Sequence, residues 1–80
     1  MSEITIARLR ALRPGQRLVY YRGNFEQDIE RNQSTPTYRE ILTRLRDTAA
    51  FLSRSGKVRL EKHSYGESQF HLYEYVAIGV

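Results

Sequence analysis

The sequence contains no cysteine and no long apolar run. Without cysteine there is no disulfide, no thiolate nucleophile and no cysteine-rich zinc site, so packing has to supply the stability. No apolar stretch approaches the roughly 20 residues that a membrane span requires. Arg8, Arg10 and Arg13 interrupt the N-terminal apolar residues, which argues against a signal peptide. We therefore expect a cytoplasmic protein with no membrane partner.

Motifs for catalysis and cofactor binding are missing too. No serine has a plausible histidine and aspartate partner, and no glycine-rich loop is suited to binding phosphate. His63 and His71 would approach each other across a hairpin, beside Glu61 or Glu74. No third ligand stands at a recognised spacing from them. We expect neither an enzyme nor a cofactor or metal site.

The 80 residues predict one domain, 1–80, with a small core that dimerisation would help to stabilise. The net charge is +4 and is concentrated near the N-terminus, where residues 1–22 carry five arginines against Glu3. This excess favours an anionic partner. Most of the basic residues are arginine, which suits bidentate recognition of phosphate but is equally expected from a GC-rich gene.

Residues 37–54 show the clearest pattern in the chain, that of a long amphipathic helix. At 100° per residue, seven apolar or small side chains share one stripe. Pro36 suits the first helical position, or Thr37 and Glu40 form a capping box instead. Gly56 suits the end of the helix. The stripe consists of Tyr38, Ile41, Leu42, Leu45, Thr48, Ala49 and Leu52.

The remaining segments predict a second helix, three strands, and one segment that fits either a helix or a loop. Residues 4–12 fit a helix that ends before Pro14, although their β-branched start also fits a strand. Residues 24–33 fit either a helix capped by Asn24 or a loop. Strands are predicted at 17–22, 57–63 and 70–78, with a turn at 64–68.

The faces of two strands are ambiguous. In strand 17–22, either Leu18 and Tyr20 or Val19 and Tyr21 point into the core. Strand 70–78 is apolar on both faces, so that either both are covered or one is a contact surface. Its two faces carry Phe70, Leu72, Val76 and Ile78, interrupted by Glu74, and Tyr73, Tyr75 and Ala77.

The predicted fold is α+β: a short N-terminal helix, a three-stranded antiparallel sheet, and the long helix 37–54 before a C-terminal hairpin. This order of elements resembles the winged-helix family over nearly the whole chain. The sequence also resembles short uncharacterised prophage-type proteins in PGQRLVYYRG (14–23), GKVRL (56–60) and YVAIG (75–79). The winged-helix resemblance implies a DNA-binding regulator of bacterial or prophage type. In such a protein, helix 37–54 would read the groove of duplex DNA and hairpin 57–77 would touch its backbone.

The candidate DNA-binding residues lie on the exposed side of the long helix and around the hairpin. Arginine binds guanine edges bidentately, and small or hydroxyl side chains permit a close approach to DNA. Cations on the hairpin would add salt-dependent contacts to phosphate. The alternative interpretation is an ordinary solvated surface with local ion pairs. The candidates are Thr37, Arg39, Thr43, Arg46 and Arg54 on the helix, with Arg59, Lys62 and Tyr65 on the hairpin.

A second functional interpretation is a protein–protein interaction module, such as a phage-type inhibitor that binds a host protein. It would use Phe51, which lies about 120° from the buried stripe, or the tyrosine face with Tyr73 and Tyr75. A homodimer would also use Phe51. If these aromatics share one exposed patch while Arg39 and Arg46 are held in ion pairs, the interaction module is favoured. If the arginines of the helix and the hairpin converge on one convex face instead, DNA binding is favoured.

Overall fold

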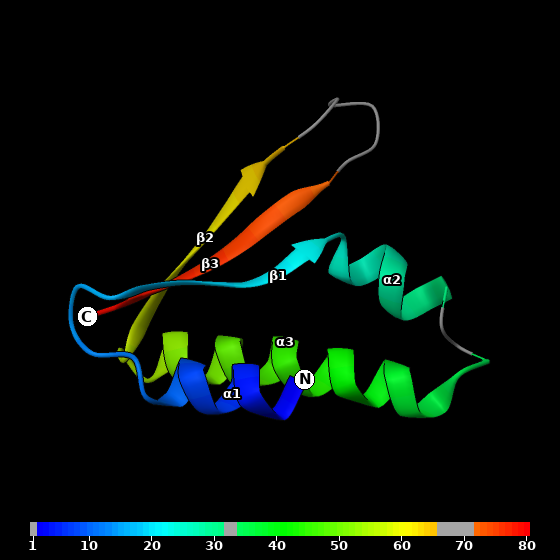
Figure 1. The fold of residues 1–80 in the computed structure, drawn as a ribbon, viewed down its shortest axis with the longest axis horizontal. Coiled ribbons are helices and arrows are strands. Elements are labelled where there is room, and N and C mark those ends of the chain that lie inside the picture. Colours follow the sequence, from blue (N-terminus) through cyan, green and yellow to red (C-terminus); the bar gives the residue numbers. More distant parts are fainter. Residues whose placement is uncertain (1, 32–33, 66–71) are drawn as a thin grey trace.

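The computed structural model describes residues 2–31, 34–65 and 72–80, and it is an α+β fold with a three-stranded antiparallel sheet, as predicted. Helices α1 and α3 lie side by side against one face of the sheet, and α2 bridges the end of β1 and the start of α3 (Figure 1). The long helix is followed by a C-terminal strand hairpin, also as predicted. The elements are α1 Ser2–Arg10, β1 Arg17–Gly23, α2 Phe25–Arg31, α3 Pro36–Arg54, β2 Val58–Ser64 and β3 Tyr73–Gly79.

Both ends of α3 follow from its sequence. The helix begins at Pro36, so the proline start is confirmed. Thr37 lies inside the helix and the N-cap is Thr35, which makes no side-chain capping bond, so the alternative capping box of Thr37 and Glu40 is wrong. At the other end Gly56 has φ +76°, and the Lys57 N–H donates to the Leu52 carbonyl over 2.9 Å. This bond and that of the Gly56 N–H to Ser53 form a Schellman motif, which satisfies the last carbonyls and turns the chain into β2.

The two shorter helices settle two open points. The N-terminal segment is a helix from residue 2 to 10, not from 4 to 12, and its strand alternative is wrong. The segment after Gly23 is helical over residues 25–31. Asn24 caps it, because its Oδ1 accepts the Gln27 N–H over 3.2 Å. Residues 32–33 lie outside the described part.

The sheet order is β1-β3-β2, so β3 is central and pairs antiparallel with both neighbours. Leu18, Ala77 and Leu60 stand in one cross-strand row and pack toward the helices. Tyr20 also points inward, which confirms the first of the two alternatives for β1. A register shift between Val19 and Tyr21 adds an extra residue, so Tyr21 turns to the helix side as well.

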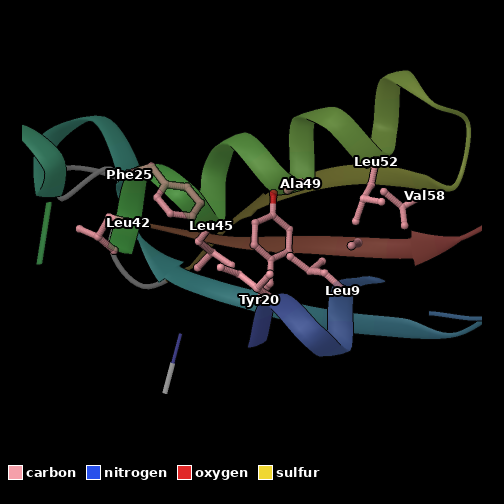
Figure 2. Packing of buried hydrophobic residues seen from close by; sticks show 10 residues of the cluster. Leu9, Tyr20, Phe25, Leu42, Leu45, Ala49, Leu52 and Val58 are labelled. Atoms are coloured by element: carbon pink, nitrogen blue, oxygen red, sulfur yellow. The ribbon is translucent and has the colours of Figure 1, made fainter. Parts of the chain in front are cut away.

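The core fills the space between α1, α3 and the inner face of the sheet (Figure 2). The leucines and the central alanine of the predicted stripe of α3 are buried, but Tyr38 is 44% exposed, against the prediction. The reason is length: α1 has nine residues and α3 has nineteen, so α1 cannot flank the first turns of α3. The labelled core side chains in Figure 2 are Leu9, Tyr20, Phe25, Leu42, Leu45, Ala49, Leu52 and Val58.

The far end of β3 is locked to the connection between α1 and β1. The Gly79 N–H donates to the Gln16 carbonyl, and the Gly79 carbonyl accepts the Gly15 N–H, both over 2.8 Å. A Cβ on Gly79 would lie 2.0 Å from the Arg13 carbonyl oxygen, so only glycine permits this approach. The other end of the hairpin projects past the helices (Figure 1). The predicted turn at residues 64–68 falls mostly outside the described part, and its Ser64 belongs to β2.

The helices that the structure describes include none with the length and apolar character needed to cross a membrane.

Candidate nucleic-acid interface

A groove of about 400 Å³ separates α3 from the projecting part of the hairpin, and the start of α2 closes one side of it. Arg46 and Ala50 reach it from α3, and Leu60 and Lys62 from β2. We call this site the aromatic groove, because its wall also includes Tyr20, Phe25, Tyr73 and Tyr75; Asn24, Glu26 and Glu61 complete the lining.

The aromatic wall is held in place by contacts among the rings. The ring centroids of Phe25 and Tyr75 are 4.6 Å apart, and the Phe25 N–H donates to the Tyr75 hydroxyl over 3.2 Å. Tyr73 meets Tyr75 edge to face at 6.2 Å. Behind them, Tyr21 stacks on Phe25 at 4.2 Å. A wall of interlocked rings is rigid, so a ligand would meet a surface that is already formed.

Tyr21 is fixed from α2 as well. Its hydroxyl donates to the Asp28 carboxylate, and a Cβ on Gly23 would lie 2.8 Å from that carboxylate oxygen. Gly23 also has φ +136°, a backbone conformation that favours glycine at this position. Burial, followed by the bond to Asp28, raises the pKa of Tyr21, which therefore stays a neutral donor.

Two predicted DNA-binding cations meet at the aromatic groove. The Lys62 Nζ lies 4.6 Å from the centroid of the Tyr73 ring, a cation–π contact. The Arg46 Nε lies 3.3 Å from an Asp47 carboxylate oxygen, with both side chains about half exposed or more. An exposed pair between sequence neighbours contributes little, so it leaves the Arg46 guanidinium available to an anion.

Arg46 belongs to a row of side chains that continues along α3. Residues at three- and four-residue spacing share one side of a helix. Arg39 and Thr43 line a second hollow on the first half of this side, and the Thr43 hydroxyl donates to the Arg39 carbonyl over 2.8 Å. Thr37 and Arg54 are exposed near the two ends of the helix. We call the row Arg39, Thr43, Arg46, Ala50 and Arg54 the arginine flank.

The structure separates Arg59 from the other candidates. Arg59 and Lys62 stand three residues apart on β2 and therefore point to opposite faces of the sheet. The Arg59 Nη2 lies 3.1 Å from one oxygen of Glu61, and His63 Nε2 lies 2.9 Å from the other. The two hairpin cations on the candidate list therefore lie on different surfaces, and the two-residue alternation of a strand was the signal for their separation.

The outer end of the hairpin carries Tyr65, which is 38% exposed and whose N–H donates to the Leu72 carbonyl over 3.0 Å. His71, one half of the hypothetical histidine pair, lies outside the described residues. Among the residues that are described, no three side chains of the metal-binding types gather closely enough to hold an ion.

The residues of the alternative protein-binding site do not form one patch. Tyr73 and Tyr75 are half-buried in the aromatic groove. Phe51 is 59% exposed on α3, about 100° from Ala50 around the helix, and so lies on the flank away from the groove. Arg39 forms no ion pair with another described residue, but Arg46 pairs with Asp47, and Arg59 lies on the other face of the sheet from Lys62. Neither criterion is therefore met in full.

One wall of the groove was missed from the sequence. Asn24, Phe25 and Glu26 line it, although the segment after Gly23 was interpreted only as a possible cap and short helix. Phe25 is buried, at 3% exposure, but its contact with Tyr75 on β3 joins segments far apart in the sequence. The contact between Phe25 and β3 depends on where β1 ends in the folded structure, and no pattern within the segment itself predicts that position.

No protein-family model, curated protein or solved structure matches the chain. The function must therefore be inferred from the geometry of this fold.

Proposed function

We propose that the chain is a small DNA-binding regulatory protein, in which α3 enters a groove of duplex DNA and the hairpin of β2 and β3 contacts the backbone. The observation that carries the proposal is the meeting of Arg46 and Lys62. They come from different elements, yet both line the aromatic groove, and the arginine flank leads away from it along α3. A helix bearing spaced arginines beside a cationic hairpin is suited to contact both bases and phosphates.

The order of the elements supports the same proposal. A helix, a strand, two helices and a hairpin follow one another, and the first strand pairs with the last. This is the order on which the winged-helix resemblance depends, and in that family the helix before the hairpin meets the DNA. In the present chain that helix is α3, and on its side opposite the core Arg39, Arg46 and Arg54 are exposed.

Titrating fluorescently labelled duplex DNA of mixed sequence at two salt concentrations tests the proposal. The double substitution Arg39→Ala and Arg46→Ala should weaken binding at both concentrations. The slope of log affinity against log salt should become shallower by about 0.9 for each phosphate that the double variant no longer neutralises.

Arg59→Ala is the matched control, because it removes an identical side chain from the opposite face of the sheet. It should leave affinity and slope close to those of the unchanged chain. Binding that the double variant leaves unaltered at both salt concentrations would refute the proposal, and equal losses of affinity in the control and the double variant would remove its geometric basis.

A second candidate function rests on Phe51. Phe51 is 59% exposed on the other flank of α3, and aromatic side chains are enriched at protein interfaces, so it suits contact with a protein, either a second copy or a host protein of a prophage-type inhibitor. Phe51→Ser would lower the sedimentation mass of the chain if a homodimer forms through this flank. An unchanged mass would show that this flank does not hold a homodimer together.

A further inference from the structure

We infer that the aromatic groove accepts one unpaired nucleotide, with its base stacked on Tyr73 and its phosphate between Arg46 and Lys62. The inference rests on the proposed DNA binding and names the form of DNA that the site prefers. The groove combines rings and cations from four segments of the chain, which is the combination that single-stranded nucleic acid requires. The arginine flank by itself offers cations but no ring.

The size of the groove suits a single nucleotide. Its volume of about 400 Å³ lies within the 300–1,000 Å³ range of pockets that hold small molecules. A paired base keeps both faces stacked inside the duplex and cannot reach a ring that lies between two elements of a protein. Only a base that has left the stack can enter the aromatic groove.

Lys62 now lies over the ring that the base would use. Its side chain is exposed and flexible, so the ammonium can move from Tyr73 to a phosphate. A cation–π contact at an exposed site is weaker than the stacking of a base on an aromatic ring, so the exchange favours the base. Arg46 stands on the facing helix and offers the second donor to the same phosphate.

The charge balance of the groove agrees with an anionic ligand. Two acidic residues, Glu26 and Glu61, belong to the lining, but strand alternation puts the Glu61 side chain on the opposite face from Lys62. Glu61 is bonded to Arg59 and His63 and is neutralised there. Asp47 pairs with Arg46 over 3.3 Å but does not line the groove. Among the lining side chains Glu26 alone stands against Arg46 and Lys62, so the lining itself carries a net positive charge.

The test compares a fully paired duplex with the same duplex carrying one extra, unpaired nucleotide. The unchanged chain should bind the bulged duplex about tenfold more tightly, as expected for one stacked base. With 2-aminopurine at the bulge, binding should quench its fluorescence. Tyr73→Leu keeps an apolar side chain but removes the ring, and should abolish both the preference and the quenching.

Phe51→Leu is the control, because it removes an aromatic ring from the opposite flank of α3 and should keep the preference and the quenching. Lys62→Gln, at an exposed position, provides a second variant and should reduce the preference for the bulge. Equal affinity for both duplexes, with binding still dependent on Arg39 and Arg46, would overturn the unpaired-nucleotide site alone. Failure to bind either duplex would overturn the proposed function itself.

Discussion

The two faces of the sheet use the same kinds of side chain in different ways. On the face toward the helices, Lys62 lies over an aromatic ring and meets no carboxylate partner among the described residues. On the open face, Arg22 pairs with Glu74 across the strands at 2.9 Å, and Arg59 pairs with Glu61. Arg22 and Arg59 on the open face thus each have a carboxylate partner on the sheet, whereas at the aromatic groove Lys62 has none among the described residues and Arg46 pairs only with its sequence neighbour Asp47. The position of a charge in the fold, and not the total of +4, indicates where an anion would bind.

The two faces also differ in what covers them. Leu45, Ala49 and Leu52 of α3 pack on the inner face, whereas no helix that the structure describes covers the outer one (Figure 1). Even so, Val76 on the outer face is fully buried. It lies in the row between Val19 and Glu61, and we infer that side chains of the same face, including the aliphatic stem of Glu61, exclude water from it. Flexible side chains can rearrange around a substituted residue, whereas helices packed on the inner face cannot.

The largest expected effect tests this difference in cover. Leu45→Ala should lower the free energy of unfolding by about 2–5 kcal/mol, because the packed helices cannot close around the cavity. Val76→Ala should cost about 2 kcal/mol or less, since the flexible stems above it can collapse onto the smaller side chain. Urea unfolding followed by circular dichroism measures both.

Val19→Ala, in the same row, is the companion variant for the outer face and should cost no more than Val76→Ala. If Val76→Ala were as damaging as Leu45→Ala, the outer face would be as rigid as the inner one and the comparison would fail.

Several features of the fold could be predicted from short stretches of the sequence. The stripe of α3, the stop at Gly56 and the cap at Asn24 were predicted, because each depends on residues within a few positions of one another. Arg59 and Lys62 lie on opposite faces because side chains alternate along a strand, so their separation could also have been predicted from the sequence.

Other features depend on the packing of distant segments. Tyr21 faces inward only because the pairing of β1 with β3 shifts register between Val19 and Tyr21. No residue type in β1 predicts this shift. The exposure of Tyr38 follows from the shortness of α1 beside α3. The aromatic groove joins β1, α2, α3 and the hairpin, so it appears only when these elements are assembled.

An intermediate effect concerns the inner face at alkaline pH. Burial, and to a smaller extent Tyr75, raises the pKa of Tyr20 to about 12 from its ordinary value of 10.0. A raised pKa means that Tyr20 stabilises the fold fully below pH 10 and that this contribution is lost as the pH rises to about 12. The free energy of unfolding should therefore fall with pH across this interval.

Tyr20→Phe should make that fall smaller, and absorbance at 295 nm should show one late-ionising tyrosine fewer. The hydroxyl points toward α3 near Ala49 (Figure 2), so phenylalanine keeps the ring packing while removing the titrating group. An identical pH dependence in the variant would show that Tyr20 is not the group responsible.

The smallest expected effect concerns the open face, where charges are paired with one another. The hydrogen bond from His63 lowers the pKa of Glu61 from its ordinary value of 4.5, and Arg59 contributes less. The stabilisation from Glu61 is therefore present above that ordinary value and is lost as the pH falls through the lowered one. It should be small, because ion pairs at exposed positions contribute little. In a carbon-13 titration of the carboxyl group, His63→Gln should raise the pKa of Glu61 more than Arg59→Gln does. The reverse order would mean that the arginine, and not the histidine, is the main partner of this carboxylate. Arg59 would then be held by Glu61 on the open face, whereas Lys62 has no carboxylate partner among the described residues.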